Sequence, residues 1–327
     1  MAAVGRIPGV LLSLRRRRLQ AAARARPRSR PGGWSLLRRR GAAGTAAPVR
    51  EASEPGDADR RRRHAGRTMS TAAVTANERD LGARVRYCAQ VGASLMVMTV
   101  GALVMLLVAL VTGFQLRRFY SECLAATLGR IVLAIFGVRF VVHREASYPA
   151  GQVVYVSNHT STIDVFVLVA LGLPNARFFL SGFLRKLLPL GLIGYLTGIF
   201  WTVPQERPHE RRRIFRRAAA TLRASGESVY LSPEGERVTT GRIGHFNKGA
   251  FHLAADLRAP IVPLFIRIPR DIDPGKGLAA RSGRVDVFVG APIDTSRWRV
   301  EDVEAHRDAM RAHYVRWHAE LVGTGWE

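Results

Sequence analysis

The chain has 327 residues, of which 50 are Lys or Arg and 25 are Asp or Glu, so its formal net charge is +25. This length accommodates one large α/β domain or two small ones, with enough apolar residues for a real core. The two cysteines, Cys88 and Cys123, lie in or beside apolar stretches, which argues against a disulfide framework and against a cysteine-based metal site. We expect a reducing, cytosol-facing compartment.

The first 68 residues carry much of the positive charge. They contain 18 Arg and 4 acidic residues, a net charge of +14, which leaves +11 for the rest of the chain. They show no sustained helical or strand period, so we predict that residues 1–68 are disordered. Three interpretations stay open: a basic tail, an organelle transit peptide, or a segment upstream of a true translation start at Met69. Because no recognition motif accompanies the charge, we expect no nucleic-acid partner.

The segment 87–116 contains no Asp, Glu, Lys, Arg or His. As a helix it would be about 45 Å long, more than the ~30 Å hydrocarbon core of a bilayer. Two arginines flank each end: Arg84 and Arg86 before it, Arg117 and Arg118 after it. The positive-inside rule therefore gives no orientation, and a full span and a hairpin both fit. A second apolar run, 123–142, predicts an interfacial helix and the start of a strand, so residues 84–140 are predicted to anchor the chain to a membrane.

From about residue 140, short apolar runs alternate with helical patterns. Strands are predicted at 152–156, 177–180, 199–203, 228–231, 261–266 and 285–289, and helices at 163–171, 210–224, 248–257 and 300–321. This alternation predicts a single α/β domain at 141–327, with a largely parallel central sheet flanked by helices and preceded by the N-terminal hydrophobic membrane helix or hairpin.

The stretch VSNHTSTIDVF, 156–166, places an imidazole and a carboxylate five positions apart. If a strand ends near 156 and Ser161 caps a helix, Asp164 in the first helical turn can reach back to His159. Such a pair suits a general base, and the nucleophile would then be a hydroxyl of the substrate, without a covalent intermediate. The alternative is a capping box, in which Asp164 stabilises the helix by about 1 kcal/mol and His159 has no chemical role.

Two later stretches favour an anion site. In VYLSPEGER, 229–237, a predicted strand ends in a turn that presents Glu234 and Arg237 at the carboxyl edge of the sheet, where ligands of open α/β sheets bind. Lys248 and Gly249 follow at the start of the next predicted helix. A guanidinium, an ammonium and helix N–H groups together suit a phosphate dianion, although each feature alone is equally typical of a solvated surface.

These blocks resemble the PlsC-type glycerolipid acyltransferases, most closely the 1-acylglycerol-3-phosphate (lysophosphatidic acid) acyltransferases. The resemblance rests on NHTSTID, EGER, FNKGAFHLA and IVPLFI, which occur in the family's order between about 141 and 268. It implies acyl transfer from acyl-CoA or acyl-carrier protein to the free hydroxyl of a lysophospholipid, with phosphatidic acid as the leading product. It also implies a partner bilayer, a cell-membrane location with the catalytic domain facing the cytoplasm, and neither a metal nor a redox cofactor.

The resemblance further implies roles for single residues. His159 and Asp164 would form the general-base dyad. The acceptor and its phosphate would be bound by Glu234, Gly235, Arg237, Lys248, Gly249 and Arg207. The second family block usually ends G-x-[IF]-[FP]-V-x-R, but GIFWTVPQER delays the arginine to Arg207, which puts its role in doubt. Glu236, Val238 and Asn247 also depart from the pattern, so another lysolipid or an amino-acid lipid stays open as the acceptor.

Two other functions stay open at this point. One is a membrane lipid carrier or scaffold in which the motifs persist without turnover. The other is a hydrolase that uses His159 together with Ser157 or Ser161. The apolar stretch 183–201, interrupted by Pro189 and glycines, is interpreted as an acyl-chain groove or membrane-dipping loop, or alternatively as a plain core segment. The basic helix 210–224 could lie on anionic lipid or be merely solvated.

Overall fold

The computed structural model describes residues 55–269, 272 and 281–323, and the chain divides into the units Met1–Ala65 and Gly66–Glu327. Residues 1–54, most of the segment predicted to be disordered, lie outside the described residues. Helix α2 (Pro55–Val111) begins within that segment. Its sequence has a proline and two nearby acidic residues, Asp57 and Asp59, at the start, and both features favour a helix N-terminus.

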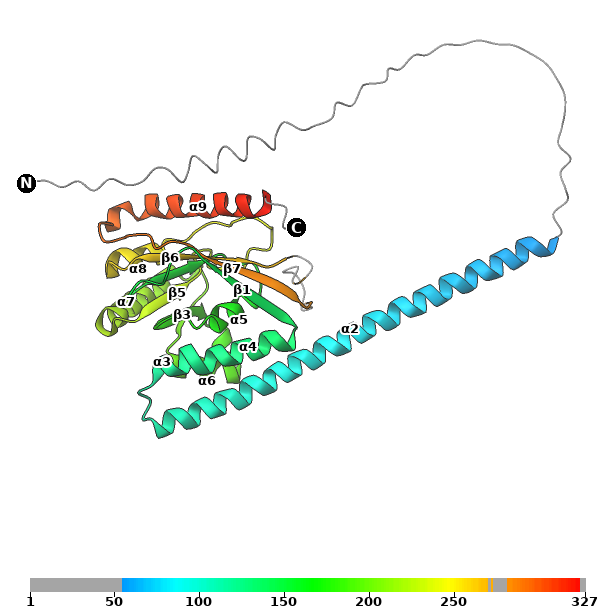
Figure 1. Ribbon diagram of the computed structural model, residues 1–327, viewed down its shortest axis with the longest axis horizontal. Coiled ribbons are helices and arrows are strands. Elements are labelled where there is room, and N and C mark those ends of the chain that lie inside the picture. Colours follow the sequence, from blue (N-terminus) through cyan, green and yellow to red (C-terminus); the bar gives the residue numbers. More distant parts are fainter. Residues whose placement is uncertain (1–54, 270–271, 273–280, 324–327) are drawn as a thin grey trace, which may run out of the picture. The chain divides into compact units, whose positions relative to one another are not determined.

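A seven-stranded sheet forms the centre of the second unit, in the order β1-β7-β6-β2-β5-β3-β4 (Figure 1). The strands are β1 (Val138–Arg144), β2 (Val154–Ser157), β3 (Ala176–Ser181), β4 (Phe200–Thr202), β5 (Ser228–Leu231), β6 (Ile261–Arg267) and β7 (Gly283–Val289). The five strands from β6 to β4 are parallel, whereas β6 and β7 are antiparallel and β7 is parallel to β1. The predicted α/β class with a largely parallel sheet is confirmed. The boundary predicted at 140/141 falls inside β1.

Helices cover both faces of this sheet. They are α3 (Arg117–Phe119), η1 (Tyr120–Ala125), α4 (Ala126–Ile135), α5 (Ile163–Ala170), η2 (Leu184–Lys186), α6 (Leu188–Thr197), α7 (Pro208–Ser225), α8 (Gly249–Leu257), η3 (Val300–Asp302) and α9 (Val303–Gly323). One core lies between the sheet and α7, α8 and α9, and the other between the opposite face and α4 and α5 (Figure 1). Side chains alternate between them: Val154 and Val156 enter the first core, and Tyr155 enters the second.

The apolar end of α2 is one arm of a helical hairpin. The chain turns after Val111 through Gly113 and Phe114, both with positive φ, and returns as α3, η1 and α4. Gln90 Nε2 donates to the carbonyl of Ile135 at 3.0 Å, and Met105 packs in one cluster with η1 and α6. The predicted helix before the first strand is therefore the return arm, and it joins α2 to the sheet.

One described helix is long and apolar enough to cross a membrane. It is Leu81–Val111, 31 residues that include an 18-residue window with a mean hydropathy of 2.6, and many of its large apolar side chains are exposed. This length and composition suggest membrane association.

The stretch 183–201 forms η2, α6 and β4 rather than a loop. Pro189 lies in the first turn of α6, where its missing N–H costs no helical hydrogen bond. Leu196 of α6 packs in the cluster that contains Met105 of α2. Leu188 and Tyr195, by contrast, are 87% and 72% exposed. The segment is thus part core and part apolar surface.

Candidate active site

The loop 158–162 joins β2 to α5. Because β2 and β5 are adjacent and parallel, their carboxyl ends meet at one edge of the sheet. The loop that follows β2 and the turn Pro233–Glu234–Gly235 that follows β5 therefore come together there. Open α/β sheets bind their ligands at this edge.

His159 and Asp164 are in contact across this loop. Asp164 Oδ2 lies 2.9 Å from His159 Nδ1. The carboxylate is 1% exposed and the ring 32% exposed, so the acid is buried beneath a ring that reaches solvent. An ionised carboxylate only accepts hydrogen bonds, so Nδ1 carries the proton and the lone pair of a neutral ring is on Nε2.

Hydrogen bonds at the helix start are also present, although the N-cap is Thr162 rather than the predicted Ser161, and the Thr162 side chain makes no capping hydrogen bond. Asp164 Oδ2 accepts hydrogen bonds from the backbone N–H groups of Thr160 at 2.6 Å and Ser161 at 2.9 Å. The Ser161 hydroxyl accepts the N–H of Ile163 at 3.0 Å, and helix α5 starts at that residue. The same carboxylate therefore closes the helix start and contacts the imidazole, so the two interpretations of Asp164 do not exclude each other.

Glu234 braces the main chain of this loop. Its side chain is buried, Oε2 accepts the backbone N–H of His159 at 2.6 Å, and Oε1 accepts that of Gly244 at 2.7 Å. Burial raises the pKa of this carboxyl, and the two backbone hydrogen bonds act against that rise. The position predicted to bind the acceptor thus has both carboxylate oxygens bonded to backbone. Motif spacing alone does not predict these two hydrogen bonds to the backbone.

Further contacts fix the backbone around His159. Its carbonyl accepts the N–H of Val238 at 2.8 Å. The neighbouring Asn158 is buried and pairs with the backbone of Ile266 in both directions, at 2.9 Å as donor and 2.8 Å as acceptor. The loop after β2 is therefore tied to the β5 turn and to the end of β6. An asparagine before the histidine could have indicated this, because an amide matches a peptide group in donors and acceptors.

Arg237 and Gly235 lie beside this loop. Arg237 is exposed, and its Nη1 donates to the Thr162 hydroxyl at 2.5 Å. Gly235 has φ +72°, and a Cβ there would lie 2.7 Å from Asn247 Nδ2. Only glycine fits this turn without displacing that amide.

The other predicted anion-binding residues lie elsewhere. Lys248 precedes α8 and forms an ion pair with Glu304. Gly249 begins α8, where a Cβ would meet the Phe215 ring at 2.6 Å. Arg207 precedes α7 and pairs with Glu210 at 2.5 Å. The structure thus places Arg237 in contact with the loop that carries the dyad, through Thr162, whereas Arg207 and Lys248 form ion pairs with Glu210 and Glu304.

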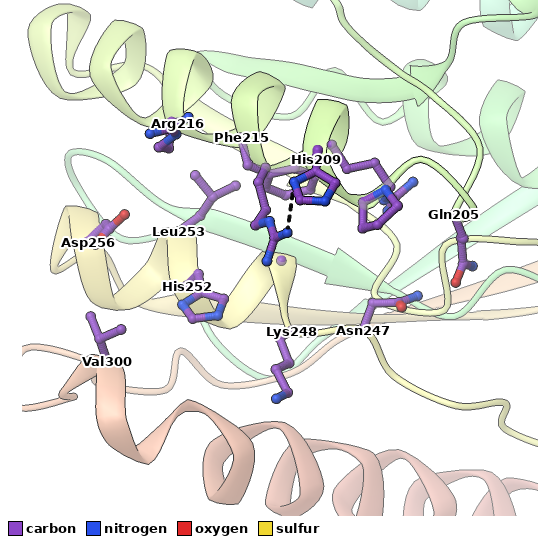
Figure 2. Close-up of a pocket in the computed structure, with 14 residues that line it drawn as sticks. Gln205, His209, Phe215, Arg216, Asn247, Lys248, His252, Leu253, Asp256 and Val300 are labelled. Carbon is purple, nitrogen blue, oxygen red and sulfur yellow. Dashed lines mark hydrogen bonds between the residues drawn. The ribbon is translucent and has the colours of Figure 1, made fainter.

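A cavity of about 800 Å³ opens between α7 and α8. Figure 2 shows Gln205 and Asn247 at one end and Arg216 and Asp256 at the other. Lys248 and Gly249 line it, so part of the predicted anion site belongs to this cavity. Among the described residues, no cluster of three His, Cys, Asp or Glu side chains has the geometry to hold a metal ion.

Ser157 and Ser161, the serines considered as nucleophiles, are both buried. The Ser157 hydroxyl donates to the carbonyl of Asn158 at 2.8 Å and lies 2.9 Å from the hydroxyl of Tyr230. Burial raises the pKa of Tyr230 far above its ordinary value, so this pair stays neutral.

Residues 139–267 match the sequence model of the protein family described as Acyltransferase. The chain is 31% identical over 199 residues to the 1-acyl-sn-glycerol-3-phosphate acyltransferase alpha of Bos taurus. The matched region covers 58% of this chain and 67% of the bovine protein. The protein of the same name from Homo sapiens is also 31% identical, and 68% of its length is covered. The chain belongs to this acyltransferase family. It is an enzyme similar to the 1-acylglycerol-3-phosphate O-acyltransferases.

The fold has a solved relative as well. The crystal structure of the 1-acyl-sn-glycerophosphate (LPA) acyltransferase PlsC from Thermotoga maritima superposes with a TM-score of 0.55 over 71% of this chain and 97% of that one, at 19% identity. This likeness shows that the fold of the chain occurs in a solved structure.

Proposed function

We propose that this acyltransferase moves an acyl group from a thioester, acyl-CoA or acyl-carrier protein, to the free hydroxyl of 1-acylglycerol-3-phosphate, which gives phosphatidic acid. The observation that carries the proposal is the 2.9 Å contact between His159 Nδ1 and Asp164 Oδ2 at the carboxyl edge of the sheet. The two mammalian relatives, both 1-acyl-sn-glycerol-3-phosphate acyltransferases, support this acceptor.

His159 is the proposed general base. Its Nε2 takes the proton of the acceptor hydroxyl while the hydroxyl oxygen attacks the thioester carbonyl carbon. The C–S bond then breaks, and the leaving thiolate receives the proton from the imidazolium. The buried carboxylate of Asp164 holds the ring in the required tautomer and stabilises its positive charge.

The backbone N–H groups of 159–161 are all bonded to protein carboxylates. In our proposal they position the base and leave stabilisation of the oxyanion to donors outside this loop. Glu234 is then a positioning residue rather than an acceptor ligand. Its two hydrogen bonds hold the loop at the correct distance from the β5 turn.

Arg237 is the proposed first ligand of the acceptor phosphate. It is exposed beside the dyad and uses Nη1 for the Thr162 hydroxyl, which leaves its other N–H groups for phosphate. Lys248 would have to leave Glu304 to assist, and Arg207 would have to leave Glu210. Both therefore have secondary roles in this proposal.

The proposed location is a membrane face, with the catalytic unit on the cytoplasmic side. The apolar helix Leu81–Val111 and the exposed apolar side chains of α6 support contact with lipid. A lysolipid acceptor would then enter from the bilayer.

Product identity tests the proposal. Membranes that contain the full chain are supplied with labelled acyl-CoA and, in parallel, acyl-carrier protein, together with a panel of lysolipids. We expect labelled phosphatidic acid from 1-acylglycerol-3-phosphate, formed about 10²–10⁴-fold more slowly by the His159→Ala protein. Transfer to a different headgroup alone would replace the acceptor, and no transfer to any lysolipid would favour a lipid carrier.

A further inference from the structure

The cavity between α7 and α8 begins beside the proposed active site. Asn247, at its near end, donates from Nδ2 to the backbone carbonyl of Glu234 at 3.0 Å. The side chain of that glutamate accepts the N–H of His159 at 2.6 Å. Asn247 and Glu234 therefore connect the cavity to the loop that carries the proposed base. From there it extends along α7 to Arg216 (Figure 2).

The cavity wall is strongly cationic. Four cations and one carboxylate line it, a formal net charge of +3 with both lining histidines neutral: Arg211, Arg212, Arg216 and Lys248 against Asp256. Lys248 is paired with Glu304, and Arg211 Nη1 donates to the carbonyl of Val203 at 2.8 Å.

Arg212 and Arg216 are the available cations. They lie one helical turn apart on the same side of α7, and both are exposed. In the described part of the chain neither is within ion-pair distance of a carboxylate, and Arg212 Nη2 lies 3.3 Å from Nδ1 of the His209 ring.

Apolar side chains separate the cations. Phe215, Leu253 and Val300 line the cavity, and Figure 2 shows Phe215 and Leu253 between Arg216 and His252. A volume of about 800 Å³ is in the range of sites for cofactor-sized ligands and exceeds what a single phosphate needs. The wall therefore suits a ligand with several phosphates and a flat apolar ring.

We propose that this cavity binds the nucleotide end of a CoA thioester, its adenine ring and its phosphates, with Arg212 and Arg216 as the phosphate ligands. The flexible pantetheine arm then passes Asn247 and brings the thioester to His159. This inference rests on the proposed function and deepens it, because it selects a CoA thioester over a carrier protein as the donor. A carrier protein brings a single phosphate on its arm and no nucleotide to fill the far end.

Direct binding tests the inference apart from catalysis. Calorimetry on the full chain in detergent or nanodiscs measures the Kd of CoA and of 3′-dephospho-CoA. We expect Arg212→Ala/Arg216→Ala to weaken CoA binding about tenfold or more, since charge-assisted hydrogen bonds to phosphate are lost. The matched control is Arg213→Ala/Arg217→Ala, which removes the same charge from the same helix at positions that do not line the cavity. It should change the Kd by less than twofold.

Kinetics separates the donor from the acceptor. In the Arg212→Ala/Arg216→Ala protein, KM for acyl-CoA should rise by the same factor, with kcat and KM for the lysolipid unchanged. An S-acyl-pantetheine donor, which lacks the nucleotide, should be used equally by the parent and the variant. If the double variant does not fold, Arg212→Gln and Arg216→Gln are measured singly.

Three results would overturn the inference: equal effects of both arginine pairs, a rise in KM for the lysolipid instead of the donor, or CoA binding that is insensitive to all these variants. CoA binding that depends on Arg212 and Arg216, without acyl transfer to any lysolipid, would support the cavity assignment and contradict the proposed function. The two failures are therefore distinguishable.

Discussion

The carboxylate of Glu234 holds the main chain of His159, because Oε2 accepts the histidine N–H at 2.6 Å. The other oxygen ties the same side chain to Gly244 at 2.7 Å. Glu234, the acid of the EGER block, therefore contacts the backbone of His159 and fixes the position of its imidazole. Two motifs 75 residues apart in the sequence become one unit by this contact.

Glu234→Gln should lower kcat more than KM. The amide keeps one acceptor oxygen but turns an NH₂ group toward a backbone N–H, so one hydrogen bond is lost in a buried site, at a cost of about 1–3 kcal/mol of stability. We expect kcat to fall about tenfold or more because the loop shifts. Steady-state kinetics and thermal unfolding check this, with the exposed neighbour substitution Glu236→Gln as control. A large rise in KM for the lysolipid with unchanged kcat would instead make Glu234 an acceptor ligand.

Asn158→Ala should destabilise the enzyme by about 2–3 kcal/mol, because two hydrogen bonds with the buried backbone of Ile266 are lost and its polar groups are left unpaired. Asn158→Asp keeps the acceptor and loses the donor, so it should fall between the parent and the alanine variant at neutral pH. Denaturant unfolding measures both. An alanine variant as stable as the parent would show that these hydrogen bonds do not fix the loop.

Asp286 should make the folding stability fall at acidic pH. Burial by itself would raise its pKa, but hydrogen bonds from His143 and Arg284, together with their charges, outweigh burial and lower it. A carboxyl with a lowered pKa in the folded state contributes stability above its unfolded pKa, about 3.9, and loses it as the pH falls through the folded value.

The matching substitution is Asp286→Asn. It should cost about 1–2 kcal/mol at pH 7, and the difference from the parent should shrink below about pH 4, where the parent loses its own contribution. Urea unfolding at a series of pH values measures this. A constant difference between pH 7 and pH 3 would show that the carboxylate charge is not what stabilises the pairing of β1 with β7.

The hairpin predicts on which side of the membrane α2 begins. Gln90 contacts Ile135 of the return arm, and Leu133 of the same arm packs in the sheet core, so α2 runs back alongside the catalytic unit. In a protein with both native cysteines changed to serine, Ala83→Cys should react with an impermeant maleimide from the side of the catalytic unit. Labelling from the opposite side only would establish a full span.

The sequence predicted the local elements well. Ser228–Leu231 was predicted with its observed bounds, since a short buried strand between turn residues has a local signature. The contact of His159 with Asp164 was predictable for the same reason, because the spacing and the helix start determine it.

Long-range features were not predictable from the pattern. The antiparallel placement of β7 next to β6 depends on chain crossovers rather than on side-chain periodicity. The brace of Glu234 on His159 and the pairing of Lys248 with Glu304, 56 residues away, arise only when the fold brings distant segments together. From the sequence alone, a lysine just before a helix is predicted to be an anion ligand, because its acidic partner is not visible there.

The central claim is that His159 takes the proton of the acceptor hydroxyl, and single-turnover acyl transfer by His159→Ala tests it most directly. We predict that this protein binds CoA and lysolipid with the parent's affinities, keeps the parent's unfolding midpoint within a few degrees, and transfers acyl groups about 10²–10⁴-fold more slowly. Transfer within a factor of two of the parent's rate, in a protein shown to be folded and to bind both substrates, would contradict the account.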